Sequence, residues 1–197
     1  MPTTQVRADE LTDEARKHVD AVIELVTDHD TLDFRVADVV RVAGSCNAAF
    51  YRAFTSKDEL VLAASRETSK RTMAAFRRSL PPDPTPTQVV TAWVTQLLRH
   101  ASTRRHSRAA RAFALDRYRL ARQFPSETAD NARILQEPLA QALAAAGVAD
   151  RGLVLESIVE MVLSLQAAHI ASNRTFSPRK IKSVAGLCVR MAGLPAD

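Results

Sequence analysis

Apolar residues recur every three or four positions along most of the chain, which is the spacing of amphipathic helices. The first such stretch covers residues 11–29. Two shorter stretches follow, over residues 36–43 and 47–53, and Gly44 lies between them. Glycine at that point favours a tight turn, because it adopts a positive φ angle without steric cost. We therefore predict three N-terminal helices, with the last two in a helix-turn-helix arrangement.

A longer helix is predicted next. Ser56 followed three residues later by Glu59 is a capping-box pattern, and the apolar spacing then continues to Leu80, where a proline-rich segment over residues 81–86 ends it. Further helices are expected over residues 87–101, 104–123 (as one helix or two), 126–146, 150–172 and 178–193. Ser126 and Asp150 are the expected N-caps of two of them. With only 5 glycines in 197 residues, the chain is predicted to be all-α.

The charge is unevenly distributed, although the net charge is only +5. Residues 9–33 hold nine acids against two bases, and residues 35–78 hold nine bases against four acids. A positive field that attracts nucleic acid therefore has to be local to the segment after residue 34. The polar N-terminus and the lack of a long apolar run predict a cytoplasmic protein with no membrane association. The two cysteines, Cys46 and Cys188, are expected to be free thiols.

The segment from Phe34 to Leu60 carries a specific set of spaced residues. These are Ala43-Gly44, then Phe50-Tyr51, then Phe54, then Ser56-Lys57-Asp58-Glu59-Leu60. In this pattern, over about residues 12–65, the chain resembles the TetR family of bacterial repressors. The resemblance implies a DNA-binding domain over residues 1–58, made of a three-helix head, and an effector-binding and dimerisation domain over residues 59–197, made of further helices. It implies a homodimer that binds a double-stranded DNA operator and is released by a small-molecule effector.

Ten residues of the head are candidate DNA contacts, because the second helix of a helix-turn-helix presents its leading residues to the major groove. Asn47 is suited to reading adenine, and Ala48 or Ala49 to touching a thymine methyl group. Tyr51 and Lys57 are expected phosphate contacts, and the arginines are expected to contact the DNA backbone. An N-terminal arm with Arg7 could reach a neighbouring groove. The candidates are Arg35, Arg41, Ser45, Cys46, Asn47, Ala48, Ala49, Tyr51, Arg52 and Lys57.

Other interpretations of these residues stay open. Tyr51 could be a half-buried core residue, Lys57 a solvated side chain, and Cys46 a small helix-start residue rather than a redox sensor. Arg35 could instead cap its helix or pair with a neighbouring acid. The chain also departs from the usual family pattern at Arg35, Ser45, Cys46, Ala48 and Ala49, which leaves the fold intact and affects which operator is read.

The body offers candidates for the effector site. An apolar or acyl-anionic effector would be lined by Trp93, Leu97, Phe113, Tyr118, Met161, Leu165 and His169, all of which could equally be ordinary core residues. Residues 99–122 hold eight arginines and one acid, which indicates either a solvated face or a site for an anion. The last two predicted helices carry broad apolar stripes, typical of a four-helix dimer interface.

Two other function classes compete with a regulator. The chain has no nucleophile elbow, P-loop or dinucleotide-binding glycine motif, and its histidines and cysteines lack metal-ligand spacing. An enzyme, a metal site and a cofactor are therefore not expected. The alternative is a degenerate member of the family that binds protein instead of DNA.

Overall fold

The computed structural model describes residues 11–29, 31–100, 104–172 and 174–195. Every regular element in these ranges is an α-helix, as the sequence predicts. In chain order the helices are α1 (Asp13–His29), α2 (Val36–Val42), α3 (Asn47–Ala53), α4 (Lys57–Ser79), α5 (Pro86–His100), α6 (Arg104–Gln123), α7 (Pro125–Ala145), α8 (Arg151–Ala171) and α9 (Pro178–Met191).

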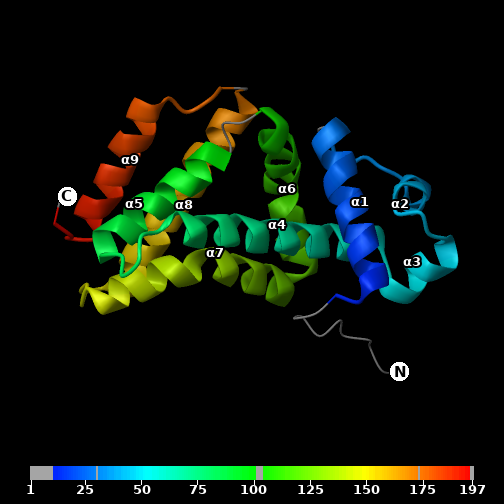
Figure 1. Cartoon of the computed structure of the whole chain (residues 1–197), viewed down its shortest axis with the longest axis horizontal. Coiled ribbons are helices and arrows are strands. Elements are labelled where there is room, and N and C mark those ends of the chain that lie inside the picture. Colours follow the sequence, from blue (N-terminus) through cyan, green and yellow to red (C-terminus); the bar gives the residue numbers. More distant parts are fainter. Residues whose placement is uncertain (1–10, 30, 101–103, 173, 196–197) are drawn as a thin grey trace.

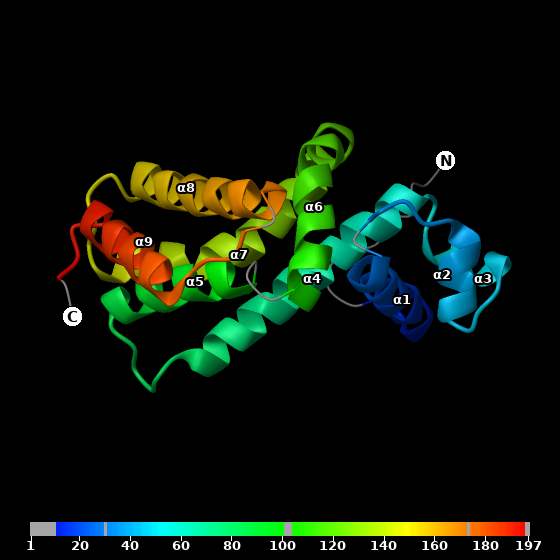
Figure 2. The ribbon, with the colours of Figure 1, turned by 90° about the horizontal axis from the view of Figure 1, so that it is seen from above.

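The helices form an elongated molecule with a small head at one end. Helices α1, α2 and α3 make the head, and α5, α8 and α9 gather at the opposite end (Figure 1). The long helix α4 runs from the head into the body, beside α7, and α6 stands across them next to α1. The view from above shows the same order (Figure 2).

Two separate hydrophobic clusters hold this arrangement together. The head cluster gathers apolar residues of α1, α2, α3 and the start of α4, together with Phe113 and Leu120 of α6. The body cluster is built around Trp93, from the rest of α4 and from α5, α7, α8 and α9. Helix α4 belongs to both, because Ala64 packs in the head cluster and Met73 in the body cluster. A displacement of α4 therefore disturbs both clusters at once. The expected boundary between a DNA-binding domain and an effector-binding domain, at residues 58 and 59, remains a prediction.

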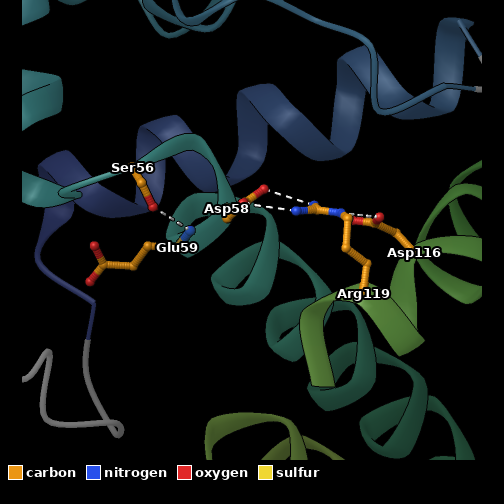
Figure 3. Close-up of polar contacts among 5 residues, drawn as sticks. All are labelled: Ser56, Asp58, Glu59, Asp116 and Arg119. Carbon is orange, nitrogen blue, oxygen red and sulfur yellow. Dashed lines mark hydrogen bonds and ion pairs between the residues drawn. The ribbon is translucent and has the colours of Figure 1, made fainter. Parts of the chain in front are cut away.

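An arginine clamp adds a polar link between head and body. Arg119 of α6 donates two hydrogen bonds to the carboxylate of Asp58, in the first turn of α4, at 2.7 and 2.8 Å (Figure 3). The same guanidinium bonds to both oxygens of Asp116 at 2.6 Å. The hydrogen bonds from Arg119 hold the pKa of Asp58 below its ordinary value, against the smaller opposing effect of its partial burial. The clamp thus joins the first turn of α4 to the helix that crosses the molecule.

The helix ends confirm some of the expected caps and contradict others. Ser56 caps α4 by accepting a hydrogen bond from the Glu59 amide. The expected N-cap at Ser126 is wrong, because α7 begins one residue earlier, at Pro125. Asp150 is the N-cap residue of α8, as expected, but it lies in the left-handed region with φ of 48° and its side chain makes no capping hydrogen bond.

Helix α8 corrects the expectation that the chain has no long apolar run. By length and composition it is the one helix in the described ranges that is apolar enough to cross a membrane, with a mean hydropathy of 1.5. Only 22% of its most apolar 18-residue window is buried within the chain. Most of its other large apolar side chains are only partly covered within the chain, and Leu153 is exposed.

The turn at Gly44 generates a first prediction. Gly44 has φ of 61°, and no atom lies within 4 Å of the place that a Cβ would take, so a side chain there meets backbone strain without a clash. Gly44→Ala is expected to lower the free energy of unfolding by about 1 kcal/mol, and Gly44→Asn by less, because asparagine tolerates this conformation. Urea denaturation followed by circular dichroism measures both. Gly152→Ala, at an open position without positive φ, is the control and should be neutral or slightly stabilising; an equal loss at both glycines would contradict the explanation.

The clamp generates a prediction about pH. Asp58→Asn is expected to lower the free energy of unfolding at neutral pH by less than about 1 kcal/mol, because the pair is partly exposed. Since the pKa of Asp58 is lower in the folded protein, its stabilisation is complete above the unfolded-state pKa of about 4 and disappears as the pH falls through the folded-state value. Thermal melting at a series of pH values should therefore show wild type and variant converging in acid.

Asp130→Asn is the matched control for that experiment. Asp130 pairs with Arg133 on its own helix, so its removal breaks no contact between head and body. A difference between wild type and Asp58→Asn that stays constant from neutral pH into strong acid would show that the clamp contributes nothing through its charge.

Candidate nucleic-acid interface

The short helix α3 is fixed to the head by two aromatic anchors. Phe50 is fully buried and Phe54, its C-cap residue, is nearly so. A helix of 7 residues is not stable alone, so its orientation depends on this packing. The turn that leads into it contains Gly44 with φ of 61°, which confirms the expected glycine conformation.

The opposite side of α3 is open to solvent. Asn47, Ala48, Tyr51 and Arg52 are all exposed and share one arc of the helix. Tyr51 is 60% exposed, and the edge-to-face packing of its ring against Phe50 leaves the hydroxyl group free to face a partner. The alternative that Tyr51 is a half-buried core residue is therefore wrong. This face combines an amide, a hydroxyl and a guanidinium, which are the groups that contact base edges and phosphates.

Two of the candidate DNA contacts, Ala49 and Ser45, do not lie on this exposed face. Ala49 is 5% exposed and packs inward beside Phe50, so the expected thymine contact falls to Ala48 alone. Ser45 is partly buried and its hydroxyl group is hydrogen-bonded within the head. Cys46 is the exposed N-cap residue of α3 and makes no side-chain capping bond.

The N-terminus of α4 lies directly after α3 and has a capped first turn. The first amides of any α-helix lack intrahelical partners and carry partial positive charge. Ser56 satisfies the amide of Glu59 (Figure 3). The Glu59 carboxylate accepts hydrogen bonds from the amide and hydroxyl groups of Thr55. The reciprocal half of the capping box therefore reaches Thr55 and not Ser56. Arg119 neutralises Asp58, the other acid of this first turn.

The cationic candidates of the head occupy different surroundings. The ammonium group of Lys57 lies 4.4 Å from the centroid of the Phe34 ring, so this side chain is packed and not merely solvated. Arg41 is exposed and forms a loose 3.6 Å ion pair with Asp38 on its own helix. Arg35 is exposed, and its backbone amide donates a hydrogen bond to the carboxylate of Asp38. Arg7 lies outside the described residues.

One buried polar residue of the head is not among the residues that the sequence analysis singles out. His18 lies on the apolar stripe of α1 and is completely buried, with both ring nitrogens hydrogen-bonded. A histidine at an apolar position of an amphipathic helix is the signal that could have found it. Among the residues described, no cluster of three potential metal ligands occurs.

The residues proposed for an effector site do not form one group. Trp93 and Leu97 are buried in the body cluster, and the Trp93 indole N–H donates to the carbonyl oxygen of Leu135 at 2.7 Å. Met161 and Leu165 pack at the edge of the same cluster. His169 is partly buried and stacks on Phe176 with ring centroids 3.7 Å apart.

The two remaining effector candidates lie away from that cluster. Phe113 packs in the head cluster, and Tyr118 is 67% exposed, so its ring does not line an interior cavity. A surface hollow of about 500 Å³ lies elsewhere, between Val148 and Leu153 at the start of α8.

The arginine-rich stretch is described only in part. The side chains of Arg104, Arg105, Arg108 and Arg111 lie outside the described residues, so the expected anion-binding face does too. Of the others, Arg119 forms the clamp, and Arg117 stacks on Tyr118 and lies 3.9 Å from Glu160 of α8. At least two arginines of this stretch thus join helices.

The sequence has no match among family models or curated proteins. Solved structures do resemble it. The fatty acid degradation regulator FadR from Bacillus halodurans is 14% identical, with a TM-score of 0.69 over 91% of this chain and 96% of that one. A TetR transcriptional regulator from Rhodococcus sp. RHA1 is 18% identical, with a TM-score of 0.71 over 90% and 94%.

A third similar structure carries a small molecule. RolR in complex with its ligand resorcinol is 16% identical to this chain, with a TM-score of 0.68 over 93% of this chain and 89% of that one. At such identities the likeness concerns the arrangement of the helices over nearly the whole length of each chain. The protein therefore has the fold of TetR-type transcriptional regulators, as the spaced residues of its head predict.

Proposed function

We propose that the protein is a homodimeric, DNA-binding transcriptional repressor that a small-molecule effector releases from its operator. The observation that carries the proposal is the two-sided character of α3. One side is locked by Phe50 and Phe54, and the other presents Asn47, Tyr51 and Arg52 to solvent. This function would place the protein in the cytoplasm, with the DNA that it binds.

The composition of the exposed face favours DNA over a protein partner. The centre of a protein interface is usually apolar and depleted of charge. The outer side of α3 is instead polar and cationic, and it continues into the capped N-terminus of α4 with Lys57 beside it. Both helix ends and basic side chains are common phosphate contacts in protein–DNA complexes.

The uncovered apolar surface of the body supports a dimer. Leu153 of α8 and Leu187 and Met191 of α9 are large apolar residues with 66%, 41% and 37% of their surface exposed. Two apolar helices from each copy can pair into a four-helix interface. A twofold dimer would also present two copies of α3 to a palindromic operator.

The response to an effector depends on α4. An effector shifts DNA binding only if it binds one arrangement of the heads more tightly than the other. Helix α4 packs in both clusters, and the Asp58–Arg119 clamp ties its first turn to α6. We propose that an apolar or acyl-anionic effector opens the packing around Trp93 and Leu97, and that α4 carries the displacement to the head. The resorcinol complex of RolR is consistent with a ligand in a body of this fold.

Selection from a library of random DNA duplexes should enrich one sequence for the purified dimer. Affinity for the enriched duplex is expected to fall by about 10³-fold or more between about 50 and 200 mM salt, because phosphate contacts release counterions. Arg52→Ala should weaken binding and reduce the slope of log affinity against log salt by about one, because one phosphate contact is removed. Fluorescence anisotropy measures both quantities.

Arg133→Ala is the control, because it removes an exposed arginine from α7 in the body. It should leave affinity and salt slope unchanged. If no duplex is enriched by an intact dimer without effector, or if Arg52→Ala and Arg133→Ala behave alike, the DNA-binding function is refuted and the protein-binding alternative gains.

The dimer is tested by a charge in the apolar surface of α8 and α9. Leu187→Glu should convert the dimer to a monomer at micromolar concentration, because each interface then buries two carboxylates without partners. Analytical ultracentrifugation measures the mass. Tyr118→Glu is the matched control, since this residue is also an exposed large apolar side chain but lies on α6. A Leu187→Glu protein that remains dimeric would show that the interface lies elsewhere.

A further inference from the structure

The buried His18 is the one polar side chain of α1 that is inside the head cluster. Its side chain is 0% exposed, and it is surrounded by the apolar residues that hold α3. A buried imidazole is costly unless both nitrogens are hydrogen-bonded. Here Nδ1 lies 2.8 Å from the carbonyl oxygen of Glu14, and Nε2 lies 2.7 Å from Oγ of Ser45.

The Glu14 carbonyl oxygen fixes the direction of the first hydrogen bond, and in a neutral ring this also sets the direction of the second. The Glu14 carbonyl oxygen can only accept, so Nδ1 of His18 must carry a proton and donate it. In the neutral ring Nε2 is then an acceptor, and the Ser45 hydroxyl group donates to it. With a neutral ring, the proton of the Ser45 hydroxyl group is directed to the interior of the head and is not available to a DNA phosphate.

The same imidazole ring contacts α3 at its start, its middle and its end. Ser45 lies just before α3, Phe50 in its middle, and Phe54 at its C-cap. The His18 ring packs edge-on against Phe50 and Phe54, with centroids 5.6 and 6.3 Å apart and interplanar angles of 87° and 86°. Three contacts from one rigid ring on α1 therefore define both the position and the tilt of a helix that is too short to hold its own orientation.

From this geometry we infer that His18 is a positioning residue for DNA binding, and that Ser45 acts as its internal partner and not as a DNA contact. The inference rests on the proposed DNA-binding function. Without the His18–Ser45 bond, α3 spends less time in the orientation that fits the major groove. The apparent affinity for DNA then falls in proportion to the competent fraction, although every DNA-facing side chain is still present.

A double-mutant cycle tests the inference on the duplex enriched from the random library. Ser45→Ala is expected to weaken binding about fivefold, which is the size of one net hydrogen bond. Ser45→Thr, which keeps the hydroxyl group, should restore most of that affinity. His18→Leu should weaken binding at least as much, and adding Ser45→Ala to His18→Leu should then change the affinity less than about twofold.

The decisive comparison is the effect of Ser45→Ala in the two backgrounds. An equal loss of affinity with and without His18 would mean that the Ser45 hydroxyl contacts DNA directly, and the inference would be overturned. Thermal melting of each variant reports whether the head is still folded. Should His18→Leu fail to fold, an equal loss of affinity in Ser45→Ala and Ser45→Thr would still exclude a role for the hydroxyl bond, and the histidine spectrum described next separates an internal bond from a DNA contact.

A second readout needs no DNA. Long-range ¹H–¹⁵N spectra of the histidine rings should show His18 protonated on Nδ1, with an Nε2 resonance that shifts in Ser45→Ala and returns in Ser45→Thr. A proton on Nε2 alone, or an Nε2 resonance that ignores Ser45, would refute the contact. If no duplex binds the wild-type dimer, the proposed function fails. The spectrum then still tests whether His18 and Ser45 are hydrogen-bonded.

Discussion

The structure depends above all on the packing of the short helix α3 against α1. Helix α3 has 7 residues and no side-chain cap, so neither its length nor its ends can stabilise it. Its order comes from Phe50 and Phe54, which are buried against α1 beside His18. Everything attributed to the exposed side of α3 requires that this buried side stay in place.

The second constraint is that the head cluster is completed by helices of the body. Phe113 and Leu120 of α6 complete the head cluster, and α4 extends from this cluster into the one around Trp93. The clamp between Asp58 and Arg119 joins the same two helices on the surface. The head is consequently sensitive to the position of α4 and α6, which is a physical requirement for any signal that begins in the body.

The sequence predicts the helices and the site where the information is local. Apolar spacing locates the helices, Gly44 locates the turn, and Ser56 locates the start of α4, because each depends on residues close together in the chain. Local rules fail for the N-cap of α7, because this helix begins at Pro125, and for the capping bond of Asp150, which starts α8 in a left-handed conformation without such a bond. Both failures lie at helix starts, where several polar residues compete for one role.

The contacts between distant residues could not be predicted in this way. Nothing near Ser45 indicates that its hydroxyl group bonds to a histidine 27 positions away, and nothing near Asp58 indicates that Arg119 is its partner. Ala49 is easily assigned to the DNA face, because a seven-residue helix has few turns from which to judge its buried side. Likewise, apolar spacing cannot separate a residue that lines a cavity from one that fills a core, as Trp93 does.

Amide hydrogen exchange of the dimer, with and without the enriched duplex, tests the central claim most directly. We expect DNA to slow exchange in one continuous region, from the turn before α3 to the first turn of α4, and to leave α5, α8 and α9 unchanged. Slowed exchange confined to the body, or none in α3 when the duplex is saturating, would contradict the claim that α3 is the DNA-reading helix.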